Sequence, residues 1–242
     1  MSSQLVAAAW HARMTHADVS DGLCVALGQP VHVLVSHSLD EVADVLEQAH
    51  ALAKQGMYVV GGLSYEAAPA FDSSLQVCSN PRFPLIEFHA FEVAQVNLIP
   101  REQLETLGPE SQFYPWQDSQ SHFDYSNSFQ QVREAIEAGE FYQINLTTRL
   151  NARSSGQDAW ALFQHLYSAQ PAPQSVFLRG SVFNAISLSP ELFFQWDGVE
   201  LHTAPMKGTR NPMSGGFEVL SDSEKDRAEN VMIVDLLRND MA

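Results

Sequence analysis

Apolar residues recur with a helical period in several parts of this sequence. At Phe129, Val132 and Ile136 they are three or four positions apart, which predicts a helix that ends near Gly139, a residue type common just after a helix C-terminus. The same period predicts further helices over residues 38–54, 158–167 and 223–240. Four helices are therefore expected, in separate parts of the chain.

Shorter apolar runs between these helices have the pattern of β-strands. Strands are expected over residues 58–65, 141–150, 176–178 and 182–188. Asp197-Gly198 is a strong signal for a two-residue hairpin turn between the runs 193–196 and 199–202. The hairpin would place Glu191, just before its first strand, at the same end of the sheet as Lys207, just after its second. Helices and strands together predict an α+β fold.

A stretch rich in Pro, Ser and Gln, residues 107–121, interrupts the periodic pattern and is typical of a linker or a surface loop. It divides the chain into an N-terminal α+β region, residues 1–115, and a second module, residues 116–242. We therefore expect two parts.

Composition excludes several classes of protein. The chain has 242 residues, 45% of them hydrophobic, which is enough for a substantial core. A net charge of −16 would repel a phosphate backbone, which argues against nucleic-acid binding. No apolar run is long enough to span a membrane, and the first residues lack the pattern of a secretory signal. With only two cysteines, the sequence fits a cytoplasmic protein.

Lys207 lies between two turn-forming residues, Pro205 and Gly208, so its loop can present the amine to a pocket. A lysine attacks carbon only after losing its proton, and partial burial beside Met206 would lower its pKa in the required direction. Taken alone, however, this pattern is more typical of an ordinary surface lysine.

Glu191 follows Pro190 and precedes the apolar run 192–194, so its carboxyl group is expected at the edge of a core. Desolvation there would favour the protonated acid, which can donate a proton to a leaving group. A solvated glutamate at the start of a strand is the alternative.

Asp226 and Glu229 are three residues apart in the last predicted helix and therefore lie on one face. That face continues into an apolar stripe formed by Ile233, Leu236 and Leu237. Carboxylates beside an apolar stripe need a positive partner, and a hard divalent cation is the simplest one. Pairing with nearby Lys and Arg side chains on a solvated helix is an equal alternative.

Four segments occur in order: Gly-Glu-Phe-Tyr-Gln-Ile-Asn-Leu-Thr-Thr-Arg at 139–149, Ser-Leu-Ser-Pro-Glu-Leu-Phe at 187–193, Thr-Ala-Pro-Met-Lys-Gly-Thr-Arg at 203–210, and Lys-Asp-Arg-Ala-Glu-Asn at 225–230. Together they make the chain resemble the chorismate-binding enzymes. The resemblance covers about half the chain, from near Phe129 to the C-terminus. It implies mostly antiparallel sheets packed as a sandwich with helices outside, with chorismate as substrate and Mg²⁺ as the metal.

Two positions separate the branches of this family. Enzymes that add water to chorismate typically carry a lysine base at the position of Gln143, and glutamine cannot accept a proton at neutral pH. Anthranilate synthases typically carry alanine at the position of Lys207, whereas lysine is the mark of the aminodeoxychorismate synthases. The resemblance therefore implies component I of that enzyme, which makes 4-amino-4-deoxychorismate for para-aminobenzoate and folate biosynthesis, using ammonia from a glutamine amidotransferase subunit.

The resemblance also implies a role for each candidate: Lys207 as nucleophile, Glu191 as general acid, Gly208, Thr209 and Gln143 as substrate-binding residues, Glu229 as a Mg²⁺ ligand and Asp226 as an acid near the metal. Relatives continue with a glycine-rich segment and another metal-binding glutamate, so this chain, which ends at Ala242, is expected to hold only the first part of the catalytic module. Two alternatives stay open. One is an inactive relative that only binds chorismate or the glutaminase partner, and the other is anthranilate synthase component I.

Overall fold

The computed structural model describes residues 7–8, 23–78, 81–100, 115–141, 143–153, 158–206 and 224–241. Two compact units divide the chain: the first unit comprises Met1–Thr106 and Leu166–Ala242, and the second unit comprises Leu107–His165. The domain boundary expected between residues 115 and 116 stays a prediction.

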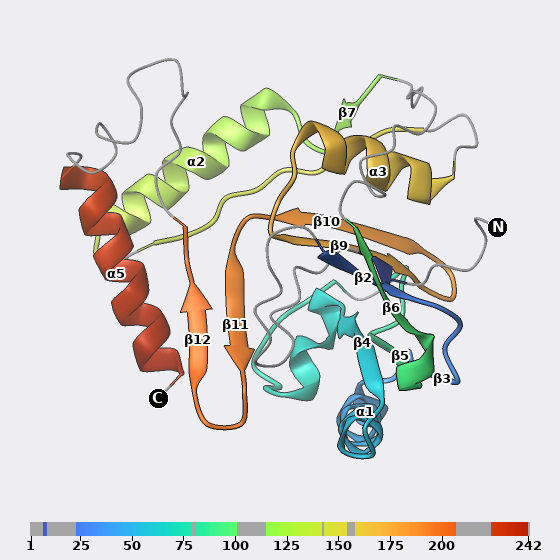
Figure 1. Ribbon diagram of the computed structural model, residues 1–242. Coiled ribbons are helices and arrows are strands. Elements are labelled where there is room, and N and C mark those ends of the chain that lie inside the picture. Colours follow the sequence, from blue (N-terminus) through green and yellow to red (C-terminus); the bar gives the residue numbers. More distant parts are fainter. Residues whose placement is uncertain are drawn as a thin grey trace. The chain divides into compact units, whose positions relative to one another are not determined.

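Two antiparallel sheets form most of the first unit (Figure 1). The five-stranded sheet has the order β10-β9-β1-β2-β6, with β1 Ala7–Ala8, β2 Leu23–Leu27, β6 Val96–Pro100, β9 Gln174–Arg179 and β10 Asn184–Ser189. The three-stranded sheet has the order β3-β5-β4, with β3 His32–Ser36, β4 Tyr58–Leu63 and β5 Ile86–Phe91. All of these strands pair antiparallel, and the prediction of an α+β fold with mostly antiparallel sheets is confirmed.

A separate hairpin and several helices complete the described part of the first unit. They are the strands β11 (Leu192–Trp196) and β12 (Leu201–Ala204), the helices α1 (Val42–Lys54) and α5 (Glu224–Asp240), and the 3-10 helices η1 (Leu39–Glu41), η2 (Tyr65–Ala70) and η3 (Val93–Gln95). Helix α3 (Ala159–Ala169) crosses from the second unit into the first. Each of the predicted helices is present, as are the strand near residue 58 and the hairpin at Asp197-Gly198.

An apolar core lies between the two sheets. Its buried members are Val25, Leu27, Phe91 and Leu178, and Tyr58, Val60, Val96 and Ala185 pack against them. These residues come from both sheets, so the sheets face each other across this core. A second core lies under α1, where Val42 and Val45 are buried with Ala67, Leu85 and Ile86. The three-stranded sheet is thus covered by α1 on one face and by the five-stranded sheet on the other.

The second unit contains helix α2 (His122–Glu137) and a short antiparallel pair, β7 (Gln117–Asp118) and β8 (Leu150–Asn151). The strand predicted over residues 141–150 is wrong: in the described residues 141 and 143–149 there is no regular structure. A strand needs a neighbour for its backbone N–H and C=O groups, and β7 pairs only with the two residues of β8.

None of the helices that the structure describes combines the length and the apolar character needed to cross a membrane.

Candidate active site

The hairpin of β11 and β12 positions the predicted acid. Its turn is built on Asp197, whose carboxylate accepts the backbone N–H groups of Val199 and Glu200 at 2.8 and 2.7 Å, and on Gly198, whose φ of +99° suits glycine. Leu192 and Ala204 pair at the open end of the hairpin. Residues just outside this pair are therefore held together.

Glu191 and the segment before Lys207 meet at that open end. The carboxylate Oε1 of Glu191 accepts the backbone N–H of Met206 at 3.0 Å. On its other side, the Glu191 backbone N–H donates to the hydroxyl oxygen of Ser189 at 3.2 Å, which fixes the turn around Pro190. The sequence prediction that the hairpin brings Glu191 and the lysine loop to one end of the sheet is supported as far as Met206.

The surroundings of Glu191 differ from those expected. Glu191 is exposed. On the following strand, Phe193, Phe194 and Trp196 are also exposed, at 70%, 50% and 59%. The expectation of a carboxyl group at the edge of a core is wrong for this structure. The physical reason is that β11 belongs to a two-stranded sheet, which is too small to bury a carboxyl group at its end.

Three candidates, Lys207, Gly208 and Thr209, lie outside the described residues. Gln143 belongs to the second unit, where it is exposed in a segment without regular structure. Of the two predicted catalytic residues, the described part of the chain therefore includes Glu191, together with its hydrogen bond from Met206, the residue before Lys207.

Helix α5 holds the two predicted metal-binding acids. Glu229 is partly covered, as are Ile233 and Leu237, four and eight residues later on the same face, whereas Leu236 is 50% exposed. Asp226 lies one turn earlier in the helix, and its side chain is outside the described residues. The carboxylate oxygens of Glu229 are ligands of the type that a hard cation such as Mg²⁺ prefers.

A different acidic group was not predicted from the sequence. Asp197, Glu200 and His202 lie at the tip of the hairpin with their candidate ligand atoms within 4.8 Å of one another, and all three are exposed. All three already have partners: Asp197 accepts two backbone N–H groups, and Oε2 of Glu200 lies 3.3 Å from Nε2 of His202. These contacts explain the cluster as the structure of the turn.

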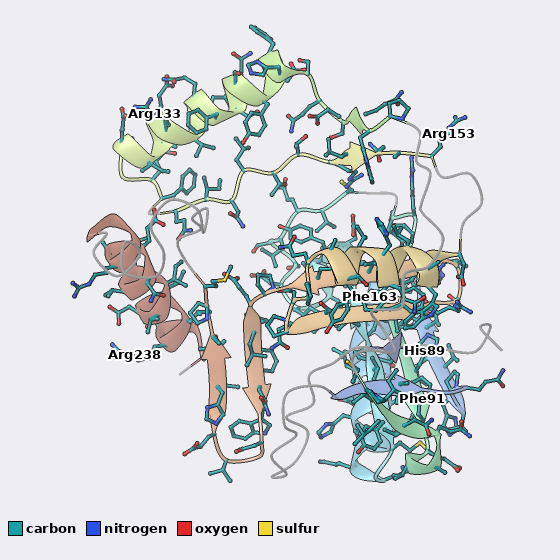
Figure 2. The ribbon with its side chains drawn as sticks, turned by 45° about the horizontal axis from the view of Figure 1, so that its top comes forward. His89, Phe91, Arg133, Arg153, Phe163 and Arg238 are labelled. Atoms are coloured by element: carbon teal, nitrogen blue, oxygen red, sulfur yellow. The ribbon has the colours of Figure 1, made fainter. Side chains whose placement is uncertain are left out.

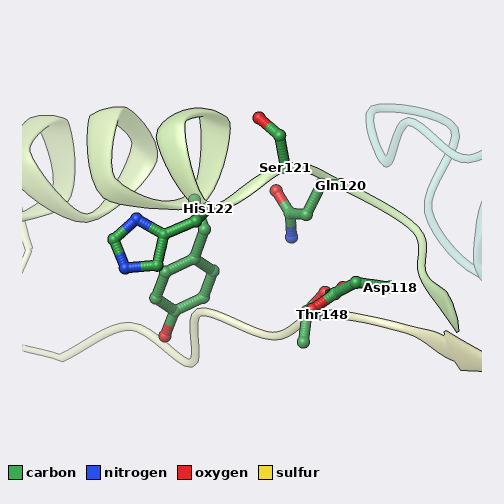
Figure 3. A pocket seen from close by; sticks show the side chains of 6 residues that line it. Asp118, Gln120, Ser121, His122 and Thr148 are labelled. Carbon is green, nitrogen blue, oxygen red and sulfur yellow. Dashed lines mark hydrogen bonds between the residues drawn. The ribbon is translucent and has the colours of Figure 1, made fainter. Parts of the chain in front are cut away.

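The second unit has a polar pocket at the N-terminus of α2, which sequence patterns did not indicate (Figure 3). Its volume is about 280 Å³, and it is lined by Asp118, Gln120, Ser121, His122, Tyr125 and Thr148. The hydroxyl of Thr148 donates to Asp118, and the amide of Gln120 donates to the carbonyl of Thr147 at 3.3 Å. These bonds join β7 to the segment before β8 and account for the polar lining.

The antiparallel sheets, and the sequence segments that contain Glu191 and the start of α5, both indicate the class of this protein. The family model described as chorismate binding enzyme matches residues 8–242, so the chain belongs to the chorismate-binding enzyme family. The resemblance inferred from the four sequence segments is confirmed.

Curated relatives of the chain carry the names of two branches of that family. The chain is 43% identical over 132 residues to aminodeoxychorismate synthase component 1 of Escherichia coli (strain K12), a match that covers 52% of this chain and 29% of the relative. It is 36% identical over 183 residues to the protein of the same name from Salmonella typhimurium, covering 73% of this chain and 39% of the relative. The chain is also 31% identical over 159 residues to the protein named anthranilate synthase component 1 1 from Haloarcula marismortui, a match that covers 63% of this chain and 32% of the relative. The matches thus span well under half the length of these relatives.

Proposed function

We propose that this chain acts on chorismate as component I of an aminodeoxychorismate synthase, converting chorismate and ammonia to 4-amino-4-deoxychorismate for para-aminobenzoate and folate biosynthesis. Relatives at 36% and 43% identity with that name support the proposal, as does the combination of Gln143 with Lys207. The single structural observation behind it is the 3.0 Å bond from the Met206 N–H to Glu191, since it sets an acid beside the residue that precedes the proposed nucleophile.

In the proposed reaction, the amine of Lys207 forms a C–N bond to the chorismate ring while the ring C–O bond breaks. Glu191 gives its proton to the departing hydroxyl, which leaves as water. Ammonia then forms a C–N bond to the ring while the C–N bond to Lys207 breaks, and a proton from the added nitrogen restores the acid form of Glu191. Because Glu191 is exposed in this structure, bound chorismate would itself have to supply the desolvation that favours the protonated acid.

Recognition of chorismate requires local positive charge, because the substrate carries two carboxylates and the chain has a net charge of −16. The backbone N–H groups of Gly208 and Thr209 would bind one carboxylate, and the amide of Gln143 would contact the substrate. Glu229, with Asp226 nearby, would hold Mg²⁺. When bound, that ion would neutralise substrate charge and orient it.

A separate glutamine amidotransferase subunit is the proposed source of ammonia, since the relatives at 43% and 36% identity are each named as component 1 of their enzyme. We place the reaction in the cytoplasm. The two cysteines are consistent with a reducing compartment, because Cys24, which is buried, and Cys78, which is exposed, are not joined in a disulfide bond.

The test is consumption of chorismate by this chain with Mg²⁺ and excess ammonium salt, with chromatographic identification of the product. Aminodeoxychorismate supports the proposal. Anthranilate would instead assign the chain to the branch represented by the Haloarcula relative. Magnesium-dependent binding of chorismate without consumption would favour a chain that only binds.

Paired variants separate the roles of the two residues. Glu191→Gln should lower the rate about 100-fold or more if Glu191 donates the proton. Glu200→Gln, at an exposed acid of the same hairpin, should leave the rate unchanged. Lys207→Ala should abolish the covalent adduct with chorismate, whereas Lys54→Ala, at the end of α1, should not. An adduct of equal yield in Lys207→Ala would rule out the nucleophile.

A further inference from the structure

A buried ionisable pair lies between the two sheets of the first unit. Glu87 is 2% exposed and His89 is 5% exposed, and both lie on β5. Successive residues of a strand point to opposite faces, so these two share a face with Phe91, which belongs to the core between the sheets. Figure 2 labels His89 and Phe91 on this part of the first unit. An acid on such a face is costly unless nearby groups satisfy it.

Three donors satisfy the carboxylate of Glu87. The Ser181 backbone N–H donates to Oε1 at 2.6 Å, and the Ser181 hydroxyl donates to Oε2 at 2.9 Å. Nε2 of His89 lies 2.7 Å from Oε1. An ionised carboxylate has only acceptors, so it fits all three groups when Nε2 of His89 carries a proton.

The other ring nitrogen of His89, Nδ1, is buried and has no hydrogen-bond partner among the described residues. A buried histidine that belonged to a larger hydrogen-bond network would use both ring nitrogens. Its one bond, to Glu87, therefore explains its position: His89 holds and orients the carboxylate.

The carboxylate in turn holds a distant part of the chain. Ser181 belongs to the turn between β9 and β10, which the Gly180 N–H closes by donating to the carbonyl of Phe183 at 2.8 Å. Glu87 and Ser181 are 94 residues apart in sequence. Their bonds join the three-stranded sheet to the end of a hairpin of the five-stranded sheet.

We propose that Glu87 and His89 form a latch that fastens the β9–β10 turn to β5, and that the turn opens when the Glu87 carboxylate is lost. Bonds to an ionised group are stronger than bonds between neutral groups, and here one residue, Ser181, makes two of them. The apolar contacts of Phe91 and Leu178 do not depend on the carboxylate. Removing the carboxylate therefore releases the turn while the sheets stay packed.

Amide hydrogen exchange of the whole chain tests this latch. Glu87→Gln keeps the size of the side chain but replaces one acceptor oxygen with an NH₂ donor. We expect the amides of Gly180 and Ser181 to exchange about tenfold faster or more, because a bond to a charged group is lost. Exchange in α1 should match the parent chain, which shows that the variant is folded. Glu92→Gln, at an exposed acid directly after β5, should leave amide exchange unchanged at Gly180 and Ser181 and also in α1.

Unchanged exchange at Gly180 and Ser181 in a folded Glu87→Gln variant overturns the latch. If that variant does not fold, Ser181→Ala decides the question, since it removes only a hydroxyl from an exposed residue. The latch then requires the Gly180 amide to exchange about threefold faster or more, as expected for one lost hydrogen bond. An unchanged rate there overturns the proposal as well.

Discussion

Phe91 is the residue of β5 that contributes to the apolar core between the two sheets. It is fully buried, with Val25, Leu27 and Leu178 in the same cluster. Truncation to alanine would leave a cavity that strands fixed by hydrogen bonds cannot fill. We expect Phe91→Ala to lower the free energy of unfolding by about 3–5 kcal/mol, measured by urea denaturation.

Phe71→Ala is the matched control, because it is the same substitution at a residue that is 60% exposed and therefore outside the core. Its cost should stay below about 1 kcal/mol. Equal losses in the two variants would show that the cluster around Phe91 is not a cooperative core.

Asp72 illustrates how a local turn changes the ionisation of one acid. The hydroxyl and the backbone N–H of Ser74 donate to its carboxylate at 2.7 and 2.9 Å, and these two bonds lower the pKa of Asp72 below its ordinary value. Since the pKa is lower in the folded state, the stabilisation exists above the unfolded pKa and is lost as pH falls through the folded pKa.

Ser74→Ala should therefore raise the pKa of Asp72 toward its ordinary value, as followed by NMR titration of the side-chain carboxyl. Ser73→Ala removes the adjacent hydroxyl, which is not one of the donors that shift this acid, and should leave the pKa where it is. If Ser74→Ala has no effect on the titration, the bond from the Ser74 hydroxyl to Asp72 does not form in solution.

At the scale of elements, the helices could be predicted from the sequence because their period is local. α1, α2, α3 and α5 each lie within two residues of the expected bounds at one end or both. β5 could not be predicted in this way. It is buried or partly buried along its whole length, so it lacks alternation, and Glu87 and His89 interrupt its apolar run. Ser181, to which Glu87 bonds, is distant in sequence, so no local pattern explains the acid on this strand.

The candidate site, too, could be predicted from the sequence only where local patterns determine it. Asp197-Gly198 fixes the hairpin, and the hairpin brings Glu191 to Met206, so this contact follows from a local signal. The exposure of Glu191 depends instead on which elements cover β11. That is a long-range property, and the apolar run after Glu191 gave no information about it.

The N-terminus of α2 rests on one side chain. The Ser121 hydroxyl oxygen accepts the backbone N–H of Asp124 at 3.1 Å and donates to the Asp124 carboxylate at 2.6 Å. We expect Ser121→Ala to weaken the helix by about 1 kcal/mol, since a cap is lost. The first turn of α2 should then show faster amide exchange.

Ser128→Ala is the control on the same helix. Its hydroxyl donates to the carbonyl of Asp124 at 3.0 Å, a bond to an acceptor that the helix already uses, and alanine has the higher helix propensity. This variant should be as stable as the parent or slightly more stable. A loss equal to that of Ser121→Ala would mean that the cap has no special role.

At the scale of the whole molecule, the dominant property is the excess of acids: 29 Asp and Glu against 13 Lys and Arg. Many of the described ion pairs join residues close in sequence, such as Arg133 with Glu137 and Arg238 with Asp235, and all four of these side chains are largely exposed. Such pairs contribute little, so the surplus acids repel one another across the folded chain.

Salt should therefore stabilise this chain. Raising ionic strength from about 0.01 M to about 0.15 M shortens the screening length from about 30 Å to about 8 Å, which weakens repulsion between distant acids more than it weakens contacts inside the core. We expect Tm to rise by roughly 2–4 °C for each 1 kcal/mol of repulsion removed, measured by calorimetry in NaCl. Repeating the series at the pH of zero net charge, located by isoelectric focusing, should give a much smaller rise, because the repulsion is then absent. If the two series have the same slope, salt acts through something other than net charge, and the surplus of acids does not limit stability.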